Sequence, residues 1–261
     1  MTHSIHPAAA NGFSKAAKLY QEVRPSYPAA LSEYLQTVFQ QSSAQLILDV
    51  GSGTGKFLPT LFPLNTQIIA IDPVAEMLNE LKFLYPYIQT IQAPSHAVPI
   101  QDSSVSAIFC AQSFHWFSNT ETLNEFSRLL QENGQVFLIW NQRDVRVDWV
   151  HKIAELLLPY EGDTPRYHSN QWQNVWQNQS NFTLLEQPIF DFSHHGTVHE
   201  VVCQRLLSTS FIAAMPLHQQ QKIAEQFADI VLHMTGKTLN DSIDFPYRCH
   251  VYRYVYKENT A

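Results

Sequence analysis

The first half of the chain alternates short apolar runs with stretches in which apolar residues recur every three or four positions. The runs are continuously apolar and rich in β-branched residues, which is typical of strands buried on both faces of a parallel sheet. The stretches between them are expected to form helices that cover that sheet. The expected strands are Leu46–Val50, Ile68–Asp72, Ile88–Gln92, Val105–Ala111 and Val136–Trp140, and the expected helices are Lys56–Phe62, Val74–Leu84 and Asn119–Leu130. After the last helix, Asn133 or Gly134 is expected to adopt the left-handed conformation that ends a helix.

After Asn141 the pattern changes. Two stretches, Phe182–Phe192 and Tyr247–Lys257, alternate apolar with polar residues, as half-exposed antiparallel strands do. Tyr252, Tyr254 and Tyr256 would then share one face of the second stretch. Helical periodicity marks the segments Val147–Leu158, Asn170–Gln177, His199–Phe211 and Leu217–Leu232. The predicted fold is an α/β, Rossmann-like, doubly wound and mostly parallel sheet with an antiparallel C-terminal hairpin and a helical insertion.

Composition narrows the class of protein. The 261 residues suit one large domain or a domain with an insertion, and 45% hydrophobic residues are enough for a full core. Sixteen basic residues face 23 acidic ones without any basic cluster, so a nucleic-acid partner is not expected. Neither a signal peptide nor an apolar run of membrane-spanning length is recognisable, so we expect a cytoplasmic protein without a membrane partner. Three widely spaced cysteines, Cys110, Cys203 and Cys249, are expected to be buried reduced thiols.

Three of the eight glycines stand at alternate positions directly after the first expected strand, as Gly51, Gly53 and Gly55. Such a loop lets the backbone approach a ligand closely, because glycine has no Cβ and tolerates positive φ. A phosphate-binding P-loop is excluded because its first glycine and its hydroxyl residue would fall on Val50 and Phe57. The third glycine of a dinucleotide fingerprint would likewise fall on a lysine. A tight turn without a ligand is the remaining alternative.

The stretch Asp49-Val50-Gly51-Ser52-Gly53-Thr54-Gly55 resembles motif I of the class I S-adenosylmethionine-dependent methyltransferases. Ile69–Leu78, Val105–Phe117 and Leu123–Gly134 resemble the family's next motifs. Phe13–Pro28 and Pro246–Arg248 resemble a subgroup that includes trans-aconitate methyltransferase-like enzymes that act on small molecules. The resemblance implies an enzyme with S-adenosylmethionine as cofactor.

The resemblance also implies which residues hold the cofactor. Asp72 would accept the ribose hydroxyls, although an aspartate there also suits a helix N-cap. Met77 would pack on adenine or belong to the core, and Arg24 would reach the cofactor carboxylate or remain solvated. After the third strand, Ser95 and His96 stand where relatives usually have Ala-Glu. The complete expected set is Tyr20, Arg24, Asp49, Gly51, Ser52, Gly53, Gly55, Asp72, Pro73, Met77, Ser95, His96, Ala111 and Gln112.

The acceptor is expected just past the fourth and fifth parallel strands. His115 is the one candidate catalytic residue, as a base or a hydrogen-bond donor, and a structural histidine is the alternative. The expected substrate residues are Trp116, Trp140, Asn141 and Ser210. No metal is expected, because the acidic residues of metal-dependent relatives are absent after these strands. His194, His195 and His199 are interpreted as part of an exposed polar loop beside a glycine turn.

These features predict three regions and a reaction. Residues 1–44 would form an N-terminal helical cap, residues 45–146 and 182–261 the cofactor-binding core, and residues 147–181 and 199–232 a helical insertion over the acceptor site. The predicted reaction transfers a methyl group to a small-molecule acceptor, with a carboxylate or another oxygen as nucleophile. A non-catalytic cofactor-binding regulatory domain and a protein methyltransferase are the alternatives. The acidic balance disfavours RNA as the substrate.

Overall fold

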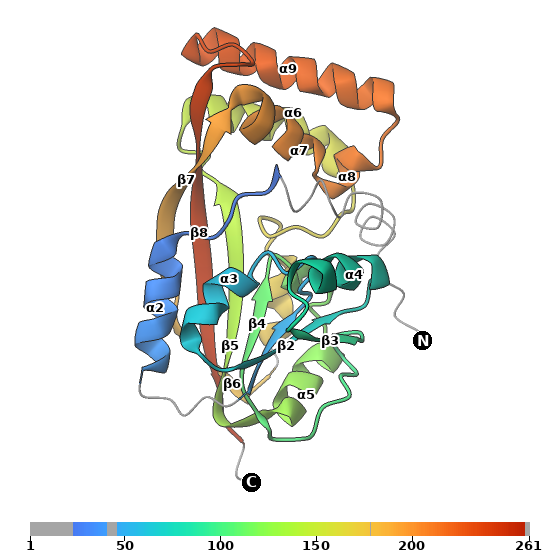
Figure 1. Ribbon diagram of the computed structural model, residues 1–261, viewed down its shortest axis with the longest axis vertical. Helices are drawn as coiled ribbons and strands as arrows, with labels where there is room; N and C mark the ends of the chain where they lie inside the picture. Colours follow the sequence, from blue (N-terminus) through green and yellow to red (C-terminus); the bar gives the residue numbers. More distant parts are fainter. Residues whose placement is uncertain (1–22, 41–45, 178, 259–261) are drawn as a thin grey trace. The chain divides into compact units, whose positions relative to one another are not determined.

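A computed structural model describes residues 23–40, 46–177 and 179–258 (Figure 1). The chain divides into two compact units. The first, which we call the core unit, comprises residues 27–141, 165–190 and 249–261. The second, the insertion unit, comprises residues 1–26, 142–164 and 191–248. Of the expected N-terminal cap, Tyr20 and the rest of residues 1–22 lie outside the described part of the chain, and helix α2, Ala29–Phe39, represents its second half.

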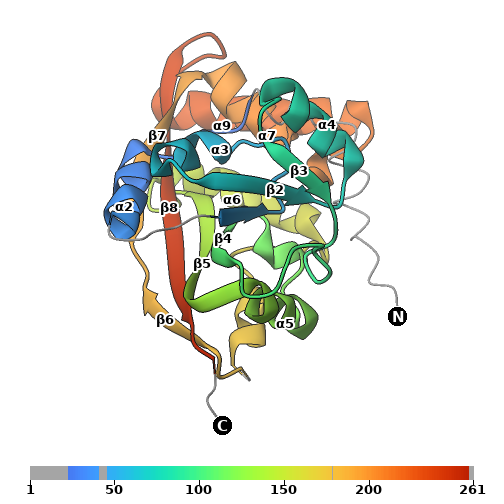
Figure 2. The same cartoon turned by 60° about the horizontal axis from the view of Figure 1, so that its bottom comes forward.

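The sheet has the order β3-β2-β1-β4-β5-β8-β6, with β7 paired to β8 (Figures 1 and 2). The pairs between β1, β2, β3, β4 and β5 are parallel, whereas β6 runs antiparallel to β8. This confirms a doubly wound sheet with antiparallel C-terminal strands, whose order reverses between β1 and β4. The strands are β1 Leu46–Val50, β2 Gln67–Asp72, β3 Gln89–Gln92, β4 Val105–Ala111, β5 Leu130–Arg143, β6 Phe182–Glu186, β7 Ile189–Thr197 and β8 Ser242–Tyr256.

The fifth strand is much longer than the predicted Val136–Trp140. Leu130 already pairs with Val105, and pairing resumes at Gln135 after an irregularity in the register. Asn133 lies in this irregular stretch with φ +62°, so the left-handed residue is confirmed, but within a bulged strand. The helix before this strand therefore ends at Leu129 and not at the predicted Leu130, because Leu130 belongs to the sheet.

Helices of the core unit cover the parallel strands. They are α2, α3 Leu58–Leu61, α4 Ala75–Leu84 and α5 Thr120–Leu129, with 3-10 turns η1 Phe62–Leu64, η2 Phe114–Trp116 and η3 Gln171–Trp176. The predicted helix Lys56–Phe62 is shorter because its first two residues complete the glycine loop and because Phe62, followed by Pro63, begins a 3-10 turn. The predicted helix Asn170–Gln177 is a 3-10 turn instead.

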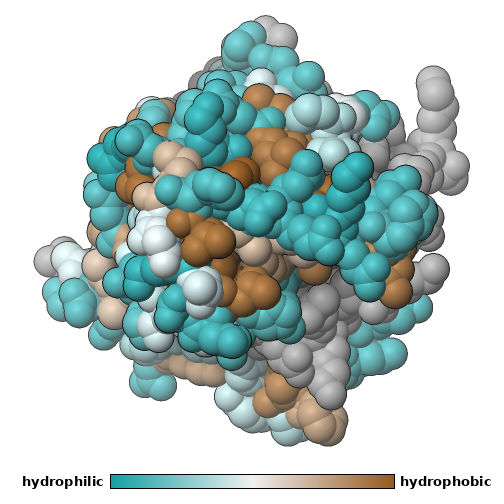
Figure 3. Space-filling view, turned by 90° about the horizontal axis from the view of Figure 1, so that it is seen from above, coloured by the Kyte–Doolittle hydropathy of each residue, from teal (hydrophilic) through white to brown (hydrophobic). Residues whose placement is uncertain are grey.

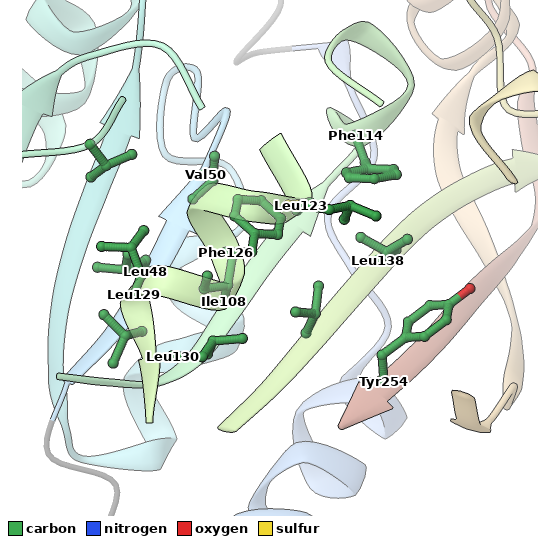
Figure 4. Close-up of a cluster of buried hydrophobic side chains, with 14 of the residues drawn as sticks. Leu48, Val50, Ile108, Phe114, Leu123, Phe126, Leu129, Leu130, Leu138 and Tyr254 are labelled. Atoms are coloured by element: carbon green, nitrogen blue, oxygen red, sulfur yellow. The ribbon is translucent and has the colours of Figure 1, made fainter. Parts of the chain in front are cut away.

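The core of this unit lies between α5 and the sheet (Figure 4). Leu123, Phe126 and Leu129 recur on one face of α5 and are at most 3% exposed. They pack with apolar side chains of the strands, as in other sheets covered by helices. Tyr254 and Tyr256 belong to the same cluster and Tyr252 packs against it, which confirms the predicted shared face. Cys110, Cys203 and Cys249 are all buried free thiols, as expected.

The insertion unit contains α6 Asp148–Glu161, the π-helix η4 Val198–Gln204, α7 Arg205–Leu207, α8 Ser210–Ala213 and α9 Leu217–Thr235. The prediction of one helix over His199–Phe211 is wrong. Thr197 and Glu200 form a capping box that starts a π-helix, and the chain breaks again at Ser208, whose hydroxyl bonds the carbonyl of Arg205. Trp149, Ile153, Val202, Phe227 and Phe245 are among the buried residues of this unit's own hydrophobic cluster.

Two sequence-based predictions for the second half of the chain, on the histidines and on the extent of the insertion, differ from the structure. His194 and His195 lie with Gly196 inside β7, and His199 lies in η4, so the exposed polar loop with a glycine turn is wrong. The expected insertion 147–181 is divided, because residues 165–190 group with the core unit.

The surface mixes polar and apolar side chains. Leu217 and Leu232 of α9 are 69% and 44% exposed, respectively. Figure 3 shows one face of the molecule, where hydrophilic residues dominate and hydrophobic patches lie between them. Among the described residues, no helix combines the length and hydropathy needed to cross a membrane.

Candidate functional site

All three loop glycines have positive φ, but for different structural reasons. Gly51, Gly53 and Gly55 have φ of +71°, +55° and +81°. A Cβ on Gly51 would lie 2.5 Å from the Cβ of Ser113, and one on Gly55 would lie 3.0 Å from Leu81. A Cβ on Gly53 would meet no atom within 4 Å. Two glycines therefore serve close packing within the protein, whereas Gly53 faces open space where a ligand can approach.

Hydrogen bonds hold this loop against the end of β2. The amides of Gly51 and Ser52 donate to the carbonyl of Ile71 at 2.8 and 3.0 Å. The amide of Gly53 donates to Oδ2 of Asp72 at 2.9 Å, and the amide of Val74 donates to Oδ1 at 2.9 Å. The carboxylate thus ties the loop to the β2–α4 turn, so the loop is built before any ligand arrives.

Asp72 combines this structural task with free acceptor capacity. Val74, not Asp72, occupies the N-cap position of α4. A carboxylate offers about four acceptor sites, and the two backbone bonds occupy one on each oxygen. Burial raises the pKa of Asp72 to about 6, against the lowering effect of the bonds from Val74 and Gly53. The remaining acceptor sites suit two vicinal hydroxyls of a ligand.

Asp49 lies in β1, two residues before the loop, and is fully buried. Neither of its carboxylate oxygens has a hydrogen-bond partner within the described residues. Burial, together with the negative charge of Asp72, raises the pKa of Asp49 to about 8. Buried carboxylates are normally paired, because removing a charge from water is costly. The carboxyl group of Asp49 is therefore suited to bind a cationic or hydrogen-bonding group of a ligand.

The end of β4 is fixed to its neighbours by the next residues. Gln112 has φ +60°, its amide donates to the carbonyl of Ile139 at 2.8 Å, and its side chain donates to that of Asn141 at 3.4 Å. Ser113 donates from Oγ to the carbonyl of Val50 at 2.8 Å. Left-handed backbone at a non-glycine residue is sparsely populated and concentrates at functional sites. Ala111 and Gln112 are only half-buried at this edge.

The segment after β3 was expected to contact the cofactor, and the side chain of Ser95 does not fit that role. Ser95 is buried, and its hydroxyl lies 2.9 Å from that of Thr122 in α5. Its side chain therefore points into the core rather than toward a ligand. His96 and Pro73 are half-buried, whereas Met77 is buried in α4 at 3% exposure.

The ring of His115 has a defined tautomer. The indole Nε1 of Trp140 lies 3.0 Å from Nδ1 of His115. Because an indole N–H only donates, Nδ1 must carry the lone pair and Nε2 the proton. Burial, with smaller contributions from the charges of Arg166 and His168, lowers the pKa of His115 to about 3. A neutral imidazole with its only lone pair occupied is suited to donate from Nε2, so the geometry favours a donor over a general base.

An aromatic cluster surrounds this pair. Trp140 has ring centroids 5.0 Å from Tyr167 and 4.5 Å from Trp172, and His115 lies 5.1 Å from Trp116. The hydroxyls of Tyr167 and Tyr252 are 2.9 Å apart. Sequence reasoning missed Tyr167 and assigned Trp172 to the insertion. The alternating face of β8 was the one sequence signal for Tyr252.

Two expected ligand residues belong to the insertion unit instead. Arg24 donates from Nε to the hydroxyl of Ser208 at 2.9 Å and from Nη2 to its carbonyl at 2.7 Å. Ser210 is buried at the start of α8. The structure thus does not group either residue with the glycine loop, whereas it places Asp49, Asp72 and Gln112 around that loop within one unit. No group of three His, Cys, Asp or Glu side chains in the described part of the chain is arranged to hold a metal ion.

Comparison with known proteins agrees with this picture. A family model described as a methyltransferase domain matches residues 48–138, from β1 to the middle of β5. An uncharacterised methyltransferase-like protein of Schizosaccharomyces pombe is 33% identical over 230 residues, which cover 88% of this chain and 89% of that protein. An uncharacterised methyltransferase of Mycobacterium bovis is 30% identical over 185 residues, covering 66% of this chain and 74% of that protein.

A solved structure of a type II methyltransferase from Anaeromyxobacter dehalogenans superposes with a TM-score of 0.66 and 19% identity. The match covers 89% of this chain and 97% of that one, which shows a shared fold.

Proposed function

The chain belongs to the methyltransferase-domain family and is an S-adenosylmethionine-dependent methyltransferase, and we propose that its acceptor is a small molecule with an oxygen nucleophile, foremost a carboxylate. The observation that supports the cofactor site best is the open space over Gly53, together with the free acceptor capacity of Asp72 and the unpartnered carboxylate of Asp49. Gly53 lies in the loop after β1, Asp49 lies in β1, and Asp72, at the end of β2, accepts a hydrogen bond from the amide of Gly53.

When bound, S-adenosylmethionine would supply a methyl group whose carbon an electron-rich atom attacks in line, with the sulfur leaving as the thioether of S-adenosylhomocysteine. In this chain, the backbone at Gly53 would admit the cofactor, and Asp72 would accept hydrogen bonds from the ribose hydroxyls. Asp49 would accept a hydrogen bond from the ammonium group, directly or through water. Orientation supplies most of the rate enhancement in such a transfer, since the nucleophile needs only to be aligned.

A carboxylate acceptor fits the absence of a base at His115. An ionised carboxylate is already nucleophilic, whereas a phenol or amine needs a base with a matched pKa. The Nε2–H of His115 is suited to hold an acceptor oxygen, and the half-buried Trp116 supplies surface beside it. Trp140 and Asn141 are buried, so we propose that they support the site from beneath. The resemblance of Phe13–Pro28 and Pro246–Arg248 to the trans-aconitate methyltransferase-like subgroup supports the same acceptor class.

The test is methyl incorporation from labelled S-adenosylmethionine into a panel of carboxylic acids and phenols by the purified protein. We expect a carboxylate to be converted to its methyl ester and no transfer to RNA or to added proteins. Cofactor binding without transfer to any acceptor would favour a regulatory domain, and labelling of protein alone would favour a protein methyltransferase. Either outcome contradicts the proposal.

A further inference from the structure

A buried arginine of the insertion unit has two side-chain nitrogens without hydrogen-bond partners in the described part of the chain. Arg205 starts α7 directly after the π-helix η4 and is 8% exposed. Its Nε and Nη1 atoms have no hydrogen-bond partner within the described residues. A guanidinium remains charged at any pH that a folded protein meets, so it cannot escape this cost by losing a proton. π-Helical turns concentrate at functional sites, where they place a side chain that a regular helix would point elsewhere.

A tyrosine beside Arg205 is unpaired in the same way. The Cζ atom of Arg205 lies 5.9 Å from the ring centroid of Tyr247. The ring of Tyr247 is wedged between Phe192 and Phe245, with centroids at 5.5 and 5.0 Å, and the residue is 1% exposed. Its hydroxyl has no partner among the described residues. A buried tyrosine hydroxyl usually has a hydrogen-bond partner, so the unpaired hydroxyl of Tyr247 is a second donor that a ligand could occupy.

A second guanidinium lies nearby. The amide of Asp144 donates to the carbonyl of Pro246 at 3.0 Å, which sets Arg143 beside the part of β8 that carries Tyr247. Removal from water lowers the pKa of Arg143, and the positive charge of Arg205 lowers it further. Glu161 and Tyr247 act in the opposite direction. The side chain of Arg143 is therefore a second cationic group within electrostatic range of Arg205 and Tyr247.

We propose that Arg205, Tyr247 and Arg143 bind the carboxylate of a small organic acid. The unpaired N–H donors of a buried guanidinium, with an unpaired O–H donor beside them, form a receptor for an oxyanion. The guanidinium of Arg205 carries one positive charge, which matches a carboxylate better than a phosphate dianion. Arg24 supports the site from the other side of the break after α7, because it fixes Ser208, whose hydroxyl holds the carbonyl of Arg205. That the bound acid is also the methyl acceptor rests on the proposed function, whereas binding itself does not.

The binding test uses calorimetry on the full chain without cofactor. The probes are a series of small mono- and dicarboxylic acids, the matching primary amides, and inorganic phosphate. We expect an acid to bind, its amide not to bind, and phosphate to bind more weakly. Arg205→Met should weaken acid binding by about ten-fold or more, and Tyr247→Phe by a smaller factor, because each removes donors to the anion. Arg248→Gln is the control, since Arg248 follows Tyr247 in β8 but pairs with Asp191 at 3.3 Å.

Melting temperature separates a ligand site from a structural role. If Arg205 serves a ligand, Arg205→Met removes an unpaired buried charge, so the free protein should melt at the same or a higher temperature. Saturating acid should raise the melting temperature of the wild-type protein but not that of this variant. Three outcomes would overturn the proposal. They are unchanged acid affinity in Arg205→Met, tighter binding of phosphate than of every acid, and a lowered melting temperature of the free variant. Methyl-ester formation is assayed separately, so a failure of methyl transfer leaves the binding result intact.

Discussion

At the residue scale, Gly53 offers the cleanest separation of cofactor binding from folding. Gly53→Ala adds a methyl group that meets no protein atom but must adopt φ +55°, at a cost of about 1 kcal/mol. Gly236→Ala is its match, because Gly236 has φ +74° and equally open surroundings at the end of α9. We expect similar losses of melting temperature in both variants. Calorimetry should show weakened S-adenosylmethionine binding in Gly53→Ala alone, and equal cofactor affinity in the two would refute the role of Gly53.

Asp72 should affect both folding and binding. Asp72→Ala leaves the amides of Gly53 and Val74 without their acceptor, so the free protein should melt at a lower temperature. The loss of acceptors for two ribose hydroxyls should also weaken cofactor binding by about 1–3 kcal/mol. Thermal unfolding and calorimetry on the same sample measure the two effects. A variant that melts early but binds the cofactor normally once folded would show that Asp72 only holds the turn.

His115 predicts a characteristic pH dependence. Its pKa of about 3 in the folded state lies below the ordinary value of 6.5, so the unfolded chain takes up a proton between these values and the folded chain does not. The contribution of this group to stability is therefore present above pH 6.5 and is lost as the pH falls toward 3. If His115 is not a base, the pH profile of the methyl-transfer rate should be the same near pH 6.5 in the wild-type protein and in His115→Gln. An ionisation near pH 6.5 that is present in the wild-type protein and absent from the variant would show that His115 acts as a base.

At the element scale, helix α5 carries three residues of the core cluster and depends on its cap. The side chain of Asn119 accepts from the amide of Thr122 at 2.8 Å. Asn119→Ala should therefore cost about 1 kcal/mol of stability. Asn79→Ala, an exposed position inside α4, is the control and should not destabilise the protein, because alanine is the better helix former. Denaturant unfolding of both variants measures the difference, and equal stabilities would contradict the capping role.

The elements also show what the sequence can and cannot predict. The strands β1 and β4 were predicted to the residue, because strands buried on both faces are almost continuously apolar, here with only Asp49 and Ser106 as polar residues. The extent of β5 was missed, since pairing of Leu130 with Val105 depends on a partner strand rather than on local pattern. The π-helix before Arg205 was also missed, because the periodicity of apolar residues does not distinguish a π-helix from an α-helix.

The same distinction holds within the site. The glycine loop, Asp49 and Asp72 are contiguous motifs with fixed spacing, and the structure brings them together as a local unit. The pair His115–Trp140 joins the 3-10 turn η2 to strand β5, and Arg205–Tyr247 joins a helix to a strand. Neither contact leaves a periodic signal in the sequence. Such pairs become visible only through the orientation of polar atoms in the folded protein.

At the scale of the whole molecule, the remaining question is what the insertion does. The sequence suggests that Val147–Leu232 covers the acceptor, whereas a second core without a ligand role is the alternative. The structure gives the insertion unit a hydrophobic cluster of its own, which a stable scaffold and a moving cover both require. The two roles differ in their response to ligands, because a cover must open and close during each turnover.

Hydrogen exchange distinguishes them. If the insertion is a cover, amides of α8 and α9 should exchange faster than those of β1 and β4 in the free protein. Their exchange should slow when S-adenosylhomocysteine and a carboxylic acid are both bound, while the sheet amides, already protected, serve as the internal control. Arg205→Met should abolish the part of this slowing that depends on the acid. Amides of α8 and α9 that are as protected as the sheet without ligand, and that do not respond to either compound, would identify the insertion as scaffold.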